Sequence, residues 1–438
     1  MIDFYKSRSM KKREEKEIFS KSHSNTYTQM FRRALVRTFA TSSSGITTTL
    51  NINSPSSIPV MRTYGVMDEK GELYPGSAIH PDLTPEKILD AYKMMLKNAV
   101  MDSVLYDSQR QGRISFYLTS FGEEAASVGS AMALNPKDEI FAQYREVGAL
   151  LYRGYSIEQV MDQCFSSVDD PGRGRMMPVH YGNKGIRLQT ISSPLATQIP
   201  QAAGAAYAHK LGKTGLISVC YFGDGAASEG DFHAGLNIAG TMGAPCLFFC
   251  RNNLWAISTP SSEQFRGDGI AGRSVALGIH TIRVDGSDLF AVYAATKAAR
   301  DIAMGVVDPR GGDGGNMQPV LIEAMTYRES HHSTSDDSTR YRSPEEIAHW
   351  REISNPLRRL RIYLEARGAW SSVEEEAFAA SERKSILSLL AKVEAKPKAS
   401  LGDMFTDVYK DIPPRLLSQE AELREYLREE MPNSAGGH

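Results

Sequence analysis

The sequence predicts an α/β protein in which helices cover both faces of a mostly parallel sheet, followed by a helical C-terminal region. Between about residues 84 and 325, short apolar runs such as 216–222 alternate with amphipathic stretches such as 229–241. Short apolar runs are typical of strands buried on both faces, and strand–helix alternation implies a parallel sheet between two helical layers. After about residue 345 the chain is charged, and its apolar residues keep helical spacing.

The first expected element is a helix that begins near Thr84. Thr84 is a capping residue, and Pro85 suits the first helical turn. Glu86, the third residue of the sequence Thr84-Pro85-Glu86, adds an acid at the start of the helix. Helical spacing then continues through the apolar residues Ile88, Tyr92, Met95, Leu96 and Ala99.

Four strands and two intervening helices are expected next. The helix at 229–241 has two acids in its first turn, and Ser287-Asp288 caps the second helix. The glycine-rich segment 308–316 is expected to be a surface loop. The expected strands are residues 216–222, 246–250, 282–284 and 319–324. The C-terminal region is expected to present an apolar helix face with Ile386, Leu389, Leu390 and Val393, and a further amphipathic stretch at 416–430.

Composition excludes several classes of protein. The 438 residues are 41% hydrophobic and 23% charged, and their formal net charge is −2. Nucleic-acid proteins need a basic excess, which is absent here. Mean hydropathy is −0.33 and no apolar run reaches the length that spans a bilayer, so neither nucleic acid nor membrane is an expected partner. The four cysteines form no CxxC pair, which argues against a disulfide scaffold or a zinc knuckle.

The N-terminal segment is not expected to be a domain. Residues 1–29 are polar and mixed in charge, whereas residues 30–67 hold arginines and serines but no Asp or Glu. This composition is typical of a mitochondrial transit peptide, so we expect a matrix protein whose translation starts at Met30. A disordered tail without function is the alternative. The predicted domains are an N-terminal extension with transit peptide and linker at 1–60, an α/β domain at 61–345 and a helical region at 346–438.

Two polar clusters carry the expected chemistry. Gly223-Asp224-Gly225 follows one predicted strand, and Asn252-Asn253 follows the next, with 26 residues between the clusters. The carboxyl ends of parallel strands share one edge of a sheet, where ligands bind. Glycines allow backbone to approach a phosphate, and a carboxylate with an amide oxygen suits Mg²⁺. Arg251 adds a cation able to bind phosphate with two nitrogens.

Two other phosphate motifs fail on inspection. Residues 225–230 have the glycine spacing of a P-loop, but Asp231 stands where lysine is required. Residues 267–272 match GxGxxG by letter, but residues 261–266 before them do not read as a strand. Neither a nucleotide phosphate loop nor a dinucleotide site is therefore expected.

The two clusters at this spacing resemble the motif of thiamin diphosphate enzymes. Beyond the motif, residues 62–430 are similar to one family, the alpha subunits of mitochondrial branched-chain 2-oxo acid dehydrogenases. Pyruvate dehydrogenase alpha subunits are similar at the cofactor motif, but they typically have His-Gly-His-Ser where this chain has His331-His332-Ser333. The stretches that carry the resemblance are 141–154, 177–182, 192–200, 221–259 and 327–338.

The resemblance implies a thiamin diphosphate-binding fold and a set of site residues. It places Mg²⁺ on Asp224, Asn253 and the main-chain carbonyl of Trp255. It places thiamin diphosphate on Tyr144, Arg145, Ser193, Leu195, Gly223, Asp224, Gly225, Ala226, Arg251 and His332. It places a structural K⁺ on Ser192, Pro194, Thr197 and Gln198. It places the substrate near Phe116, Gln143 and Tyr144, and assigns catalytic roles to His332 and Ser193.

Other interpretations of single residues remain open. Tyr144 and Phe116 are of a kind more often found in a core, and His180 reads as a buried structural histidine, outside the catalytic set. The family often has Gly-Tyr after the paired asparagines, where this chain has Leu254-Trp255. A carbonyl ligand survives a side-chain change, but leucine would be strained if the position requires positive φ.

The family reaction is oxidative decarboxylation of branched-chain 2-oxo acids, with transfer of the acyl group to a lipoyl arm of the transacylase core. The resemblance implies a heterotetramer of two alpha and two beta chains, because the beta chain supplies the glutamate that thiamin activation needs. It also implies inhibitory phosphorylation of Ser333 and Ser343, by a kinase opposed by a phosphatase. The rival interpretations are a pyruvate or acetoin dehydrogenase alpha subunit, and a regulatory chain that has lost its cofactor.

Overall fold

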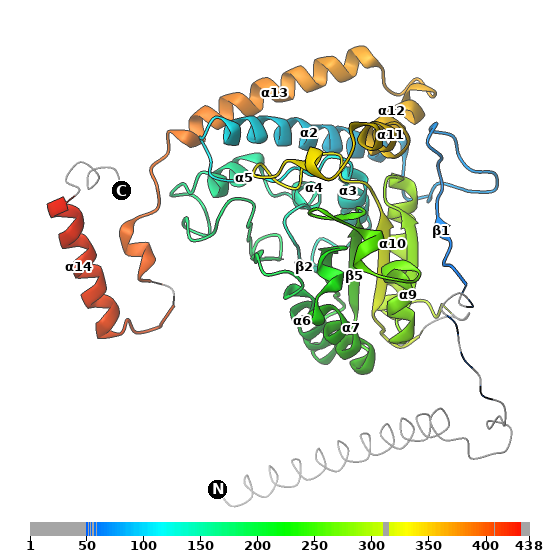
Figure 1. Ribbon diagram of the computed structural model, residues 1–438, viewed down its shortest axis with the longest axis horizontal. Coiled ribbons are helices and arrows are strands. Elements are labelled where there is room, and N and C mark those ends of the chain that lie inside the picture. Colours follow the sequence, from blue (N-terminus) through cyan, green and yellow to red (C-terminus); the bar gives the residue numbers. More distant parts are fainter. Residues whose placement is uncertain are drawn as a thin grey trace, which may run out of the picture. The chain divides into compact units, whose positions relative to one another are not determined.

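The computed structural model in Figure 1 describes residues 50, 52, 54, 57, 59–309, 315–406 and 408–430. The chain divides into two units, residues 1–59 and 60–438. The expected transit peptide and start site lie outside the described residues, as does most of the glycine-rich segment 308–316.

A seven-stranded sheet forms the centre of the second unit. All its pairings are parallel, which confirms the predicted fold class. In spatial order its strands are β1 (Thr63–Tyr64), β8 (His280–Asp285), β9 (Val320–Met325), β5 (Cys246–Asn252), β4 (Ser218–Gly223), β2 (Glu139–Phe141) and β3 (Leu188–Gln189). A separate antiparallel pair is formed by β6 (Trp255–Ala256) and β7 (Thr259–Pro260).

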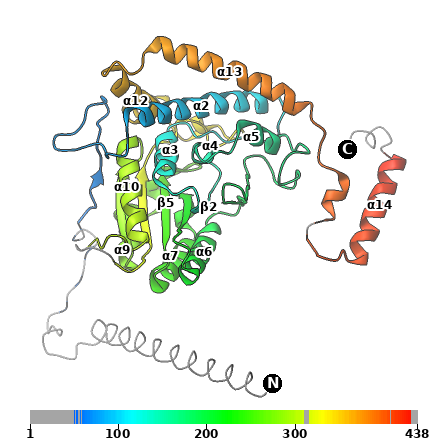
Figure 2. The same cartoon turned by 180° about the vertical axis from the view of Figure 1, so that it is seen from behind.

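Side chains that alternate along β5 build two cores, one on each face of the sheet. Leu247 and Phe249 join the larger core, with α2 (Pro85–Arg110), α3 (Glu124–Ala133) and α10 (Leu289–Ala303). Cys246, Phe248 and Cys250 join the other core, with α6 (Gln198–Gly212) and α7 (Gly230–Met242). This alternation is the two-residue period of a strand. Figure 2 shows the helices around the strands from behind.

The helix starts follow the capping signals of the sequence. The Thr84 hydroxyl accepts a hydrogen bond from the Lys87 amide at the start of α2, 3.4 Å away. Asp288 accepts from the amides of Phe290 and Ala291, the first residues of α10 beyond Leu289. Its second carboxylate oxygen accepts from the amides of Val66 and Met67 and so fixes the segment after β1.

The GxGxxG match at 267–272 leads into α9 (Gly269–Ala276). The amides at the N-terminus of this helix already have a protein acceptor. The Glu323 carboxylate from β9 accepts hydrogen bonds from the amides of Ile270 and Ala271, at 3.1 and 2.9 Å. A Cβ at Gly269 would lie 2.8 Å from an Arg283 nitrogen. A protein carboxylate thus occupies the position that a dinucleotide phosphate would need, in agreement with the sequence prediction.

The C-terminal region is helical as predicted. Ile386, Leu390 and Val393 are the buried face of α13 (Ser372–Glu394), which lies beside α2 in both views. The remaining helices are α4 (Val147–Tyr152), α5 (Ile157–Cys164), α8 (Ser261–Gln264), α11 (Pro344–Ser354), α12 (Pro356–Glu365), α13 (Ser372–Glu394) and α14 (Pro414–Glu430).

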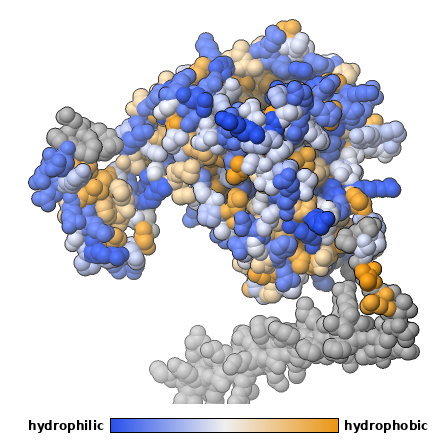
Figure 3. All heavy atoms as spheres, in the orientation of Figure 1, coloured by the Kyte–Doolittle hydropathy of each residue, from blue (hydrophilic) through white to orange (hydrophobic). Residues whose placement is uncertain are grey.

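The surface drawn in Figure 3 is largely hydrophilic, with apolar side chains spread among polar ones. Scattered apolar residues of this kind are ordinary on a folded domain. Among the described residues, no helix combines the length and apolar character needed to cross a membrane.

Candidate active site

The two polar clusters of the sequence meet at the carboxyl edge of the sheet. Gly223 at the end of β4 pairs in register with Arg251 of β5, so Asp224 and Asn253 follow neighbouring strand ends. They line one cavity of about 170 Å³. The expected site residues on its wall are Gln143, Tyr144, Arg145, Leu195, Gly223, Asp224, Gly225, Ala226, Arg251, Asn253, Trp255 and His332.

Asp224 is the buried acid of this cavity. It accepts a hydrogen bond from Gln264 Nε2 at 2.8 Å, and burial raises the pKa of its carboxyl group. No group of three or more His, Cys, Asp or Glu in the described ranges can hold a metal. Asp224 is joined on the cavity wall by two neutral groups, Asn253 and Trp255. One acid with two neutral oxygens fits a hard ion such as Mg²⁺.

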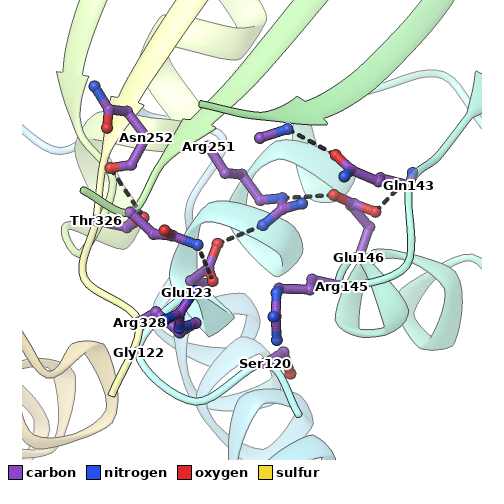
Figure 4. A network of polar contacts seen from close by, with 12 residues as sticks. Ser120, Gly122, Glu123, Gln143, Arg145, Glu146, Arg251, Asn252, Thr326 and Arg328 are labelled. Carbon is purple, nitrogen blue, oxygen red and sulfur yellow. Dashed lines mark hydrogen bonds and ion pairs between the residues drawn. The ribbon is translucent and has the colours of Figure 1, made fainter. Parts of the chain in front are cut away.

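Arg251 is held by two buried carboxylates. Its Nη1 donates to Glu123 and its Nε donates to Glu146, each at 2.5 Å (Figure 4). Burial alone would lower the pKa of Arg251, but the two carboxylates raise it above the ordinary value. The positive charge of Arg251, the expected phosphate-binding residue, is thus balanced by two protein carboxylates. Two of its three guanidinium nitrogens, Nη1 and Nε, already have protein partners.

The same two glutamates orient groups on the cavity wall. Glu123 accepts from Asn253 Nδ2 at 3.0 Å, and Asn253 Oδ1 accepts from the Trp255 main-chain amide at 3.2 Å. Glu146 accepts from the Gln143 amide at 2.9 Å, and Gln143 Oε1 accepts from the Gly223 amide at 2.7 Å. Glu123 and Glu146 therefore hold the residues at the ends of both β4 and β5.

Arg145 and His332 form the opposite side of the site. Arg145 Nη2 donates to the His332 carbonyl at 2.5 Å and lies 3.2 Å from its Nδ1. Burial lowers the pKa of His332 to about 3, with a further contribution from the charges of Arg145 and Arg328. The ring is therefore neutral near pH 7. Because arginine can only donate, Nδ1 is the acceptor and Nε2 carries the proton.

Residues 92–401 match the family model described as dehydrogenase E1 component. The chain belongs to this E1 dehydrogenase family. Members of the family depend on thiamin diphosphate, and the cavity at the sheet edge is where the chain carries the motif.

Curated relatives of this E1 chain are alpha subunits. The 2-oxoisovalerate dehydrogenase subunit alpha, mitochondrial, of Dictyostelium discoideum is 51% identical over 83% of this chain and 80% of its own length. The human protein of that name is 51% identical, covering 86% of this chain and 81% of its own length. Subunit alpha 1 of Arabidopsis thaliana is 47% identical, covering 88% and 79%.

Ser193 of the E1 chain lies outside the cavity lining. Its hydroxyl is 2.5 Å from His180 Nε2, while His180 Nδ1 lies 3.0 Å from the Pro178 carbonyl. The carbonyl requires a donor, so Nδ1 carries the proton and Nε2 accepts from Ser193. His180 is buried, as expected, but it is also the partner of a predicted site residue.

Phe116 does not line the cavity and instead packs, partly buried, against the larger core. This placement agrees with the alternative interpretation of Phe116 as a core aromatic. Tyr144 does line the cavity, where its ring stands perpendicular to that of His332 with centroids 6.3 Å apart.

The expected potassium residues lie together at the start of α6. Thr197 Oγ1 donates to the Pro194 carbonyl at 3.1 Å, and Gln198 Nε2 donates to the Tyr221 carbonyl at 3.1 Å. Ser192 is exposed at the beginning of this loop. The side-chain donors of Thr197 and Gln198 are thus both directed to main-chain carbonyls.

Leu254 adopts the positive φ that the sequence analysis identified as a source of strain, at +71°. A left-handed backbone costs a non-glycine residue roughly 1–2 kcal/mol. The turn is held by the Asn252 side chain, which accepts from the Leu254 amide at 3.2 Å. The loop that presents the Trp255 carbonyl is therefore strained but anchored.

Three functional side chains were missed by the sequence analysis: Glu123, Glu146 and Arg328. Arg328 donates to the carbonyls of Trp255 and Ile257, at 3.1 and 2.8 Å, on the cavity wall. A signal in the sequence was the pair of acids Glu123 and Glu124, which directly precede a run of small residues, 125–131. Acids beside such a run are rarely buried without a partner.

Proposed function

We propose that this chain is the alpha subunit of a mitochondrial branched-chain 2-oxo acid dehydrogenase, that is, of 3-methyl-2-oxobutanoate dehydrogenase (2-methylpropanoyl-transferring). With a beta subunit it catalyses oxidative decarboxylation of branched-chain 2-oxo acids and acylates the lipoyl group of a transacylase core. The observation that carries the proposal is the single cavity that unites Asp224, Asn253, Arg145 and His332 in a chain half identical to such alpha subunits.

In this proposal the cavity binds thiamin diphosphate and Mg²⁺. Gly223 supports this fit, because a Cβ there would meet only Gln143 and the Arg251 carbonyl, at 3.6 and 3.9 Å. The backbone is therefore open to a phosphate. Asp224, Asn253 and the Trp255 carbonyl would hold the metal, and the loop at Ser192, Pro194, Thr197 and Gln198 would hold K⁺.

When bound, thiamin diphosphate supplies an electron sink for the pair released as carbon dioxide leaves. The chain's own residues would position the bound groups and polarise the reacting bond. Neutral His332 would present Nε2–H to the bound group as a hydrogen-bond donor, and Arg145 fixes the orientation of the His332 ring. Arg145 is buried and His332 is half-buried, which limits the access of water and strengthens their electrostatic effect.

The site also gives a reason for a partner. Around the cavity, Glu123 and Glu146 are engaged with Arg251, and Asp224 receives Gln264. Among the described residues that line the cavity, Asp224 is the acid, and the proposal uses it for Mg²⁺ and not for activating the aminopyrimidine ring. We place that carboxylate on the beta subunit, in a matrix heterotetramer of two alpha and two beta chains.

Phosphorylation of Ser333 is the proposed regulation, with a kinase and a phosphatase as further partners. Ser333 follows His332 directly and is buried. A phosphate would add about −1.5 to −2 charge beside the reacting groups. Ser343 differs, because its exposed hydroxyl accepts from the Glu346 amide and caps α11. We expect modification of Ser333 to abolish activity through disorder or clash of this loop.

Co-expression with a candidate beta chain, followed by a substrate panel, tests the proposal. We expect turnover of 3-methyl-2-oxobutanoate at a kcat/KM at least tenfold above that for pyruvate. A preference for pyruvate or acetoin would indicate the rival dehydrogenases. Absence of thiamin diphosphate binding would indicate a regulatory chain.

A further inference from the structure

A buried acid with no role in the proposed chemistry lies in the middle of α2. Asp102 is fully buried, and within the described residues no lysine or arginine is at ion-pair distance from it. Its Oδ1 accepts from the Tyr117 hydroxyl at 2.8 Å. Its Oδ2 accepts from both the amide and the hydroxyl of Ser120, each at 2.7 Å. A buried carboxylate is costly without partners, and here all its partners belong to one short segment.

These three hydrogen bonds hold both ends of residues 117–120, which we call the brace. In its middle, the Thr119 carbonyl accepts from Arg145 Nη1 at 2.6 Å. Figure 4 shows the Arg145 side chain reaching toward Ser120. The brace therefore fixes one half of the Arg145 guanidinium, whose other half contacts His332.

The brace also holds the loop that carries His332. The Tyr117 amide donates to Thr334 Oγ1, and the Thr334 amide donates to the Tyr117 carbonyl, both at 3.1 Å. The Thr119 hydroxyl lies 2.7 Å from the Ser330 hydroxyl. Contacts from the brace thus flank His332 on both sides in sequence.

We infer that Asp102 is a positioning residue that sets the Arg145–His332 pair through the brace. The inference deepens the proposed function and rests on it. Removing the carboxylate leaves the hydroxyl of Tyr117 and the amide of Ser120 without their buried acceptor. The brace then shifts, and Arg145 and His332 lose their relative orientation.

The test uses the co-expressed heterotetramer with three variants. Asp102→Ala removes the acceptor. Asp102→Asn retains an oxygen for Ser120 and turns an amide toward the Tyr117 hydroxyl, which can accept. Ser108→Ala is the matched control, because this buried hydroxyl of α2 contacts only the Val104 carbonyl of its own helix.

We expect Asp102→Ala to lower kcat per cofactor site at least tenfold and to weaken binding of Mg²⁺-thiamin diphosphate at least fivefold, measured by calorimetry. Asp102→Asn should recover at least a third of the wild-type kcat, and Ser108→Ala should stay within twofold of wild type. A merely structural residue would lower the melting temperature and the fraction of active sites, but would leave kcat per site unchanged.

If Asp102→Ala does not assemble, Thr334→Val removes the hydroxyl that accepts from the Tyr117 amide of the brace, with an isosteric side chain, and should lower kcat at least threefold. The inference is overturned if the variants that assemble keep kcat and cofactor affinity within twofold of wild type, or if Asp102→Asn loses as much as Asp102→Ala. A wild-type heterotetramer inactive on every substrate would count against the proposed function instead, and cofactor affinity would still test Asp102.

Discussion

Glu123 helps to orient the side-chain amide of Asn253. Its carboxylate accepts from Asn253 Nδ2 and Arg251 Nη1, and in the proposed function the Asn253 oxygen Oδ1 would bind Mg²⁺. We predict that Glu123→Gln, which offers only one acceptor to these two donors, weakens Mg²⁺-dependent binding of thiamin diphosphate by about 10–100-fold, the usual effect of losing such a supporting residue.

The measurement is calorimetric titration of the heterotetramer at several Mg²⁺ concentrations. Glu345→Gln, at an exposed glutamate of α11, is the matched control and should bind like the wild type. Equal affinities for Glu123→Gln and the control would show that the Asn253 amide is oriented by something else.

His332 gives a prediction for stability against pH. Its pKa is lowered from 6.5 to about 3 by burial and by the charges of Arg145 and Arg328. Between these values the unfolded chain binds a proton that the folded chain does not, so stability is full above pH 6.5 and falls as the pH falls. Replacing His332 by Asn removes this loss, which amounts to about 1.4 kcal/mol between pH 7.5 and 5.5.

Urea unfolding of the wild type and of His332→Asn at both pH values, at one protein concentration, measures the difference. The variant should lose about 1.4 kcal/mol less than the wild type over this range. Equal losses would mean that His332 titrates near its ordinary pKa in the folded protein.

At the scale of elements, α13 anchors the C-terminal region to α2. Ile386 and Leu390 are each 1% exposed, whereas Leu387 on the same helix is 43% exposed. We predict that Ile386→Ala and Leu390→Ala each lower the free energy of unfolding by about 2–5 kcal/mol. Leu387→Ala should change it by less than about 1 kcal/mol. Denaturant unfolding checks both, and equal effects at the three positions would contradict the docking of this helix.

Sequence reasoning found the elements with a long apolar pattern and missed those without one. The expected strand at 246–250 is β5 (Cys246–Asn252), because a run of buried side chains shows in the sequence. The strands β1, β2 and β3 have only two or three residues and take their conformation from the neighbours they pair with.

The site residues also fall into two groups, those that the sequence predicts and those that it does not. Asp224 and Asn253 were found because their roles depend on local spacing after two strands. Glu123 and Glu146 were missed because their roles depend on contacts with residues 130 and 105 positions away in the chain. A single sequence shows the type of such residues but not the partner that makes them functional.

For the whole molecule, the arrangement of acids predicts an incomplete enzyme. Glu123 and Glu146 hold Arg251, and Asp224 is the acid that the described residues place on the cavity wall, so the proposed function assigns the remaining proton-transfer carboxylate to the beta chain. We predict that the purified chain alone decarboxylates 3-methyl-2-oxobutanoate at less than a hundredth of the rate of the heterotetramer, measured as release of labelled carbon dioxide at saturating cofactor. Adding the purified beta chain should restore turnover with a stoichiometry of one beta to one alpha.

Full turnover by the single chain would place the activating carboxylate within these 438 residues and would require one of the glutamates beside Arg251 to be released during the reaction.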